Sequence, residues 1–197
     1  MNRGRRGGQA AAPGQVRIIG GSLRGSKLPV ADRDGLRPSS DRVRETLFNW
    51  LQPMLPGSRC LDLFAGTGAL GFEAVSRGAS EVVMIERDRE LARSLSATAQ
   101  RLKVGNVRVH EADALRWLSL PHDSAASRFD LVFLDPPFAA GLWSSALAGL
   151  DGWLNDDAWL YLEAPRQADS SPGAGWRLHR QGQTRDVDFS VWRRAPR

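Results

Sequence analysis

Cysteine, histidine and long apolar runs are scarce in this chain. Of its 197 residues one is cysteine, Cys60, and three are histidine, His110, His122 and His179, which lie far apart. Metal sites built from these residues need them clustered, so the sequence predicts no metal. Cys60 has no partner for a disulfide within the chain and begins an apolar segment, which predicts a buried thiol in a reducing compartment.

No apolar run reaches the length of a membrane span, and the arginine- and glycine-rich start lacks the apolar core of a signal peptide. These absences predict a cytoplasmic protein with no membrane partner. With 42% hydrophobic residues and seven tryptophans, the chain is expected to form one globular domain with a small appendage. A monomer is the default expectation.

Positive charge is present but unevenly distributed. The net charge is +5, yet residues 1–46 hold ten lysines and arginines and four aspartates and glutamates, so the rest of the chain is close to neutral. Such a concentration supplies affinity for a polyanion without sequence selectivity. The alternative is a solvated tail, and for residues 1–13 the two interpretations are equally good.

The pattern of apolar residues, glycine and proline predicts three regions. Residues 1–15 form a disordered basic tail. Residues 16–57 form a basic extension, with strands over 16–19 and 25–30 and a helix that starts after Ser39 or Ser40. Residues 58–197 form the main domain, where strands and helices alternate.

The main domain is predicted to contain a mostly parallel sheet. Helices between successive strands imply right-handed crossovers and a sheet covered on both faces. A terminal hairpin around Gly182 adds antiparallel strands. The fold class is therefore α/β, doubly wound, with seven strands over residues 60–64, 81–86, 107–110, 129–134, 159–162, 176–180 and 187–192.

The most informative motif is Asp135-Pro136-Pro137-Phe138, which follows the buried strand 129–134. Open α/β sheets place their ligands at the carboxyl ends of strands. Pro137 has no N–H and restricts Pro136, so the Pro136 carbonyl points in a fixed direction. A carboxylate, a fixed carbonyl and an aromatic ring suit the exocyclic amino group of a flat base. The alternative is a simple turn at the end of the strand. The presence of all four residues of the motif favours the binding role over that alternative.

A second motif, Gly66-Thr67-Gly68-Ala69-Leu70-Gly71, reads G-x-G-x-x-G between a strand and its helix. Glu86 ends the next strand, where a carboxylate can accept from ribose hydroxyls. This is also the dinucleotide fingerprint, so an NAD-dependent oxidoreductase must be weighed.

Three features favour S-adenosylmethionine over NAD. Asp62 and Phe64 precede the glycines, and a carboxylate there suits a ligand with an ammonium group but repels a pyrophosphate. Asp113 follows the third strand, where it can accept from an adenine amino group. The reaction of an NAD-dependent oxidoreductase, hydride transfer, does not require the motif that begins at Asp135. The plainer alternatives are a structural carboxylate at Asp62 and a helix N-cap at Asp113.

With both motifs in this order, the chain resembles the class I S-adenosylmethionine-dependent amino-methyltransferases, whose fold is Rossmann-like. The segment from Arg37 to Leu51, RPSSDRVRETLFNWL, resembles a block of the bacterial 16S rRNA guanine-N2 methyltransferases of the RsmD family. Residues 16–21 and 61–71 resemble that family as well. The C-terminal hairpin matches less well, because a tyrosine is expected in its last strand and 183–189 has none.

The resemblance implies methyl transfer from S-adenosylmethionine to guanine N2 in 16S rRNA of the small ribosomal subunit. It places Ser40 and Asp41 beside the cofactor. The catalytic residues are then Asp135, Pro136, Pro137 and Phe138, with the cofactor bound by Ser40, Asp41, Asp62, Phe64, Gly66, Gly68, Glu86 and Asp113. Phosphate contacts are predicted for Arg17, Arg24, Lys27 and Arg37. The residues alone leave adenine N6 and cytosine N4 open, and a non-catalytic RNA-binding module is the third alternative.

Overall fold

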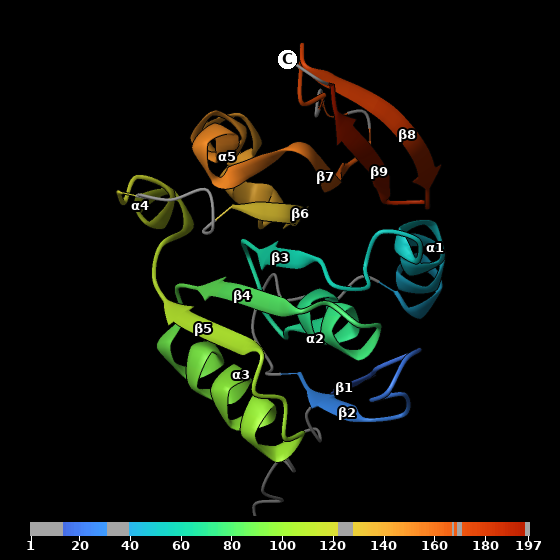
Figure 1. Ribbon diagram of the computed structural model, residues 1–197, viewed down its shortest axis with the longest axis vertical. Helices are drawn as coiled ribbons and strands as arrows, with labels where there is room; N and C mark the ends of the chain where they lie inside the picture. The colour runs from blue at the N-terminus through green and yellow to red at the C-terminus, as the bar shows by residue number, and fades with distance from the viewer. Residues whose placement is uncertain (1–13, 31–39, 122–127, 167, 169–170, 196–197) are drawn as a thin grey trace, which may run out of the picture.

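A seven-stranded sheet forms the centre of the molecule (Figure 1). The computed structural model describes residues 14–30, 40–121, 128–166, 168 and 171–195. The strand order is β5-β4-β3-β6-β7-β9-β8, in which the first five strands are parallel and β9 runs antiparallel to both its neighbours. The strands are β3 (Arg59–Asp62), β4 (Glu81–Glu86), β5 (Val107–Glu111), β6 (Phe129–Leu134), β7 (Leu154–Pro165), β8 (Trp176–Gln183) and β9 (Val187–Arg194).

Helices cover both faces of this sheet, each with its own buried apolar cluster. One face carries α1 (Asp41–Leu51), α2 (Ala69–Ser76) and α3 (Arg89–Arg101). The other carries α4 (Ala114–Leu118) and α5 (Trp143–Leu150). The predicted doubly wound, mostly parallel sheet is confirmed. None of the described helices is long and apolar enough to cross a membrane.

The N-terminal extension is a small hairpin followed by α1. Strands β1 (Gln15–Arg17) and β2 (Lys27–Pro29) pair antiparallel, and both are shorter than predicted. The residues between them form a turn closed by the Ile18 N–H to the Ser26 carbonyl, 3.0 Å, and the Gly25 N–H to the Ile18 carbonyl, 2.8 Å. Helix α1 begins after Ser40, whose side chain accepts from the Val43 N–H, as predicted for an N-cap. Of the predicted tail, residues 1–15, residues 1–13 lie outside the described residues, and the predicted boundary is wrong at Gln15, which begins β1 because it pairs with Pro29.

Two elements near the C-terminus differ from the prediction. Strand β7 has twelve residues rather than the four predicted over 159–162, because Leu154 at its start pairs with β6 and residues 159–165 pair with β9. The predicted turn at Gly182 is wrong, since Gly182 lies inside β8 and the turn follows at residues 184–186. A Cβ at Gly182 would lie 2.4 Å from the Phe189 ring, so this glycine makes room for a cross-strand aromatic.

The topology creates a switch point between β3 and β6. From β3 the chain proceeds outward to β4 and β5 on one side, and from β6 to β7 on the other. Ligands of open α/β sheets bind at such a point, beyond the carboxyl ends of the strands. Asp62 ends β3 and Asp135 follows β6, so both predicted motifs meet there.

Candidate active site

The Asp135 motif leaves the sheet at the switch point. Asp135 is half-buried and Pro136 is buried, whereas Pro137 and Phe138 are exposed. Phe138, with 40% of its surface exposed, is one of the few large apolar side chains that the described structure leaves open to solvent. Its ring centroid lies 6.0 Å from that of Trp143, whose indole donates to the Glu163 carbonyl at 2.8 Å. An exposed ring beside a half-buried carboxylate is suited to stacking on a planar ligand.

The glycine loop brings backbone close to the sheet. Gly68 adopts φ +75°, and a Cβ there would lie 2.6 Å from Leu95. At Gly71 a Cβ would lie 2.4 Å from the Met84 methyl group. Glycine is therefore required at Gly68 by conformation and at Gly71 by close helix–sheet packing. The Gly66 N–H donates to the Glu86 carboxylate at 2.9 Å, which links the loop to the end of β4.

Asp62 is a buried carboxylate beneath this loop, with 3% of its surface exposed. It accepts from the Gly71 N–H at 3.0 Å. Asp62 therefore has the structural role that the sequence analysis gave as the alternative. Burial raises the pKa of Asp62 to about 7, helped by the negative charge of Glu86 and opposed by the Gly71 hydrogen bond. A carboxyl group with this pKa is stabilised in its ionised form by any cation placed beside it.

Three predicted acidic side chains stand in a row along this edge of the sheet. Asp113 follows β5, Glu86 ends β4 and Asp62 ends β3, on adjacent strands. Adjacent strands are about 4.8 Å apart, so the row spans roughly 10 Å. Asp113 also N-caps α4 by accepting from the Arg116 N–H at 3.0 Å. Phe64 packs against the buried apolar cluster on the face that carries α4 and α5. An elongated ligand with an adenine, a ribose and an ammonium group fits this row of acceptors, whereas a pyrophosphate at Asp62 does not.

Glu163 is a site residue that the sequence analysis missed. Leu134 pairs with Leu162, so Glu163 at the end of β7 stands next to Asp135. It is buried and accepts from the Tyr161 hydroxyl at 2.5 Å. Burial raises the pKa of Asp135 well above the usual carboxyl range, and the charges of Glu163 and Asp62 raise it further. The available signal was that Tyr161 and Glu163 are two residues apart and would face the same side of a strand. The predicted strand ended at residue 162, before Glu163.

Ser40 and Asp41 have local roles in the structure. The Ser40 hydroxyl accepts from the Val43 N–H at 3.3 Å, and Asp41 accepts from Arg44 at 2.6 Å. Their predicted contact with the cofactor stays a prediction. Among the predicted RNA-binding residues, Arg17, Arg24 and Lys27 are exposed on the hairpin. Arg37 lies outside the described residues.

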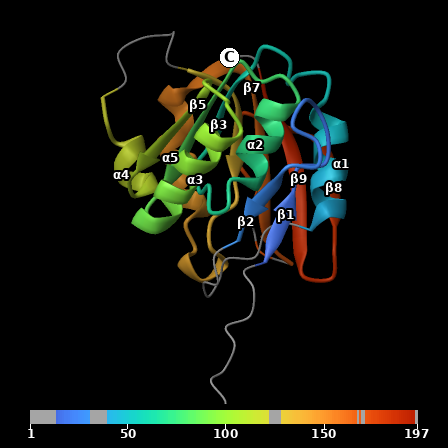
Figure 2. The same ribbon diagram turned by 90° about the horizontal axis from the view of Figure 1, so that it is seen from below.

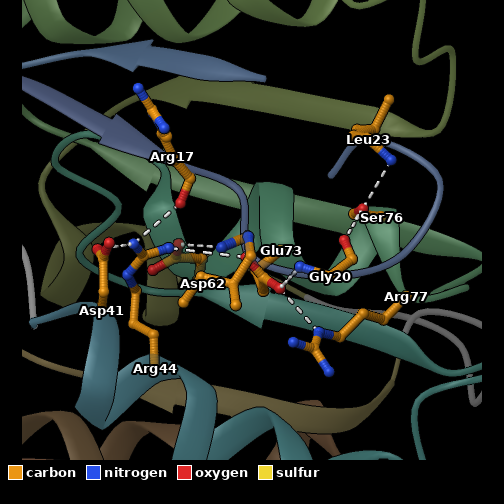
Figure 3. A network of polar contacts seen from close by, with 11 residues as sticks. Arg17, Gly20, Leu23, Asp41, Arg44, Asp62, Glu73, Ser76 and Arg77 are labelled. Atoms are coloured by element: carbon orange, nitrogen blue, oxygen red, sulfur yellow. Dashed lines mark hydrogen bonds and ion pairs between the residues drawn. The ribbon is translucent and has the colours of Figure 1, made fainter. Parts of the chain in front are cut away.

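A second residue missed from the sequence, Glu73, joins the extension to the main domain (Figure 3). This fully buried carboxylate on α2 accepts from the Ile19 and Gly20 N–H groups and from Arg77, each at 2.8 Å. Arg44 of α1, also fully buried, lies 3.6 Å from it and donates to the Arg17 carbonyl at 3.0 Å.

A neighbouring side chain on α2 reinforces this junction. The Ser76 hydroxyl donates to the Gly20 carbonyl at 2.5 Å and accepts from the Leu23 N–H at 2.9 Å. Two of the three segments that carry the family resemblance, 16–21 and 37–51, therefore meet at one buried carboxylate. The extension and the helix that follows the glycine loop are held together as one unit.

The strand order, the glycine loop and the Asp135 motif at the switch point define a class I α/β methyltransferase. Within the described residues no group of three or more histidine, cysteine, aspartate or glutamate side chains is arranged to hold a metal.

Comparison with known proteins identifies the family. The family model described as conserved hypothetical protein 95 matches residues 16–193. Ribosomal RNA small subunit methyltransferase D of Escherichia coli strain K12 is 44% identical over 187 residues, covering 92% of this chain and 91% of that protein. The protein of the same name from Haemophilus influenzae is 42% identical over 185 residues, covering 92% and 95%. The solved structure of yhhF from Escherichia coli has 41% identity and a TM-score of 0.83, and covers 93% of this chain and all of that one. The chain belongs to this family, and the resemblance to the RsmD family is confirmed.

Proposed function

We propose that this protein transfers a methyl group from S-adenosylmethionine to the N2 amino group of a guanine in 16S rRNA of the small ribosomal subunit. The observation that carries the proposal is the position of Asp135 and Pro136 at the switch point, beside a row of carboxylates suited to the cofactor. Relatives named for methylation of small-subunit rRNA support the substrate. The choice of guanine N2 rests on the family.

The residues present fit S-adenosylmethionine. Asp113 would accept from the adenine amino group, Glu86 from the ribose hydroxyls, and Asp62 would face the ammonium group. Gly66 and Gly68 allow the backbone to approach the ligand closely. When bound, the cofactor supplies an electrophilic methyl group on a sulfonium centre.

The protein's own groups prepare the base. In its ionised form Asp135 accepts from one N–H bond of the amino group and the Pro136 carbonyl accepts from the other, which directs the nitrogen lone pair out of the ring system. Phe138 stacks on the base, which contributes roughly 1–3 kcal/mol. Orientation supplies most of the acceleration, since about 7–11 kcal/mol is available from well-aligned reactants. The product ammonium is acidic, so Asp135 or water takes its proton and no stronger base is needed.

The target base must lie outside a duplex, because a stacked base cannot reach the end of β6. Flipping costs a few kcal/mol, and exposed rRNA loops reduce that cost. Arg17, Arg24 and Lys27 on the hairpin would bind the phosphates nearby.

Adenine N6 methylation is the second candidate, because the same acceptors grip either amino group. The test is tritium transfer from labelled S-adenosylmethionine to small subunits from cells lacking this modification, to naked rRNA and to duplex DNA. Label recovered as N2-methylguanosine from rRNA supports the proposal. Label in DNA, or recovered as N6-methyladenine, overturns it in favour of the second candidate.

Cofactor affinity is expected to fall as the pH drops below about 7, because Asp62 must be ionised to face the ammonium group and its pKa in the free protein is about 7. The Asp62→Asn variant keeps an acceptor for the Gly71 N–H but has no titrating group. Titration calorimetry with S-adenosylmethionine between about pH 5.5 and pH 8.5 brackets the pKa. The difference between the two proteins isolates Asp62, and parallel pH curves for both would contradict its assigned role.

A further inference from the structure

Strand β8 contains a bulge that gathers positive charge on one face of the sheet. Leu178 pairs with Trp192 and Arg180 with Val191, so His179 is an extra residue on the β8 side. In a regular strand, Arg177 and Arg180 would point to opposite faces. The bulge turns both toward the same face, and bulges that re-aim side chains in this way are common beside functional sites.

Arg193 of β9 and Trp159 of β7 extend this face across the sheet. Arg177 pairs with Arg193 of β9, and Arg193 pairs with Trp159 of β7, so the three lie in one row. The Arg193 guanidinium carbon lies 5.5 Å from the centroid of the Trp159 ring. The His179 ring meets the same tryptophan edge-on at 4.9 Å. We call this group the β8 basic face: Arg177, His179, Arg180, Arg193 and Trp159.

The charges on this face are poorly compensated. Arg177 and Arg193 are directly opposite each other, an arrangement of like charges that destabilises a sheet. Partial desolvation and the positive charges of Arg180 and Arg193 lower the pKa of His179. Within the described part of the chain, the acidic partner on this face is Asp157, 3.9 Å from Arg193, and both side chains are more than half exposed. Such a pair contributes little.

The β8 basic face lies on the same side of the molecule as the N-terminal hairpin. Helix α1 separates them and contacts both: Trp50 stacks on Phe189 of β9 at 5.5 Å, and Arg44 donates to the Arg17 carbonyl of β1. Figure 1 shows the hairpin and the β8–β9 pair on either side of α1, and Figure 2 shows all three gathered at one side of the molecule. In the hairpin, Arg17 and Lys27 are also directly opposite each other and exposed.

We propose that the β8 basic face is a second RNA-contact surface, which binds rRNA phosphates on one side of α1 while the hairpin binds them on the other. This inference rests on the proposed function. The pairing of Arg177 on the edge strand β8 with Arg193 on β9 does not stabilise the fold, whereas a polyanion that lies across the two arginines removes their repulsion. The Trp159 ring holds the Arg193 guanidinium in place, which reduces the entropy lost when it binds a phosphate.

The test compares Arg177→Gln/Arg180→Gln with a control of equal charge change at two exposed positions, Arg93→Gln on α3 and Lys103→Gln in the turn after it. Binding of naked 16S rRNA is measured over a range of salt concentrations, and methyl transfer in the same preparations. Each lost phosphate contact lowers the steepness of log K against log salt concentration by roughly 0.7–0.9. The β8 variant loses two contacts, so its slope should be shallower by about 1.5, and it should bind RNA about tenfold more weakly at moderate salt. Its KM for RNA should rise, with turnover at saturating RNA and cofactor affinity unchanged.

The outcomes separate this inference from the proposed function. A β8 variant whose slope and KM match those of the control overturns the second surface, even when the wild-type protein methylates rRNA. A wild-type protein that binds rRNA through this face but methylates none overturns the proposed function and leaves the surface standing. If Arg177 and Arg180 stabilise the fold, the thermal midpoint of the β8 variant should fall. If they only repel neighbouring arginines, the midpoint should stay equal or rise.

Discussion

Replacement of Asp135 by asparagine is expected to lower the rate of methyl transfer by about a hundredfold to a thousandfold, the usual cost of losing one preorganised electrostatic partner. Asparagine has nearly the same shape but presents an N–H donor and a neutral oxygen to an amino group that needs acceptors. Binding of S-adenosylmethionine and of RNA should change little, because the cofactor would be bound by other residues and the RNA would contact this carboxylate through a single amino group. Single-turnover tritium transfer with saturating RNA measures the effect directly.

A matched substitution makes this result interpretable. Asp156→Asn changes the same kind of side chain at an exposed position on β7, far from the end of β6, and should transfer methyl groups at the wild-type rate. Wild-type activity in the Asp135→Asn variant would show that the Pro136 carbonyl and stacking are enough, and the acceptor role of Asp135 would be withdrawn.

Replacement of Glu73 by alanine is expected to lower the free energy of unfolding by about 3–5 kcal/mol. The carboxylate is fully buried and accepts from two backbone N–H groups and from Arg77. Its removal also takes away a buried carboxylate beside Arg44 and leaves the exposed Asp41 there. For a chain of this size the loss corresponds to a fall of roughly 6–20 °C in the thermal midpoint. Urea unfolding followed by circular dichroism provides the measurement.

Control variants separate the buried charge from general damage. Glu45→Gln on the exposed side of α1 should change the free energy of unfolding by less than about 0.5 kcal/mol. Arg44→Met should destabilise the protein as well, and Arg44→Met/Glu73→Ala should lose less than the sum of the two single variants. A Glu73→Ala variant as stable as Glu45→Gln would show that the junction does not depend on this carboxylate.

Most of the fold was predictable because its signals are local. The segments 81–86 and 129–134 are apolar runs, and both strands have the predicted bounds. Asp88 N-caps α3 through its own side chain, and Ser40 does the same for α1. Cys60 is buried as expected, and burial raises the pKa of its thiol to about 12. The bounds of β7 were missed because residues 155–157 near its start are polar, and because pairing with β6 at Leu154 and with β9 as far as Pro165 extends the strand at both ends.

The sequence by itself determined the chemistry: the Asp135 motif, the glycine loop and the carboxylates at the strand ends, each set by a few consecutive residues. Only the tertiary structure decided which of these groups are neighbours. Glu163 stands beside Asp135, Glu73 beside Arg44, and Arg177 opposite Arg193 because of strand order, strand register and a single bulge. Such contacts join residues far apart in the chain, and burial together with the charge of Glu163 then raises the pKa of Asp135. No local pattern contains that information.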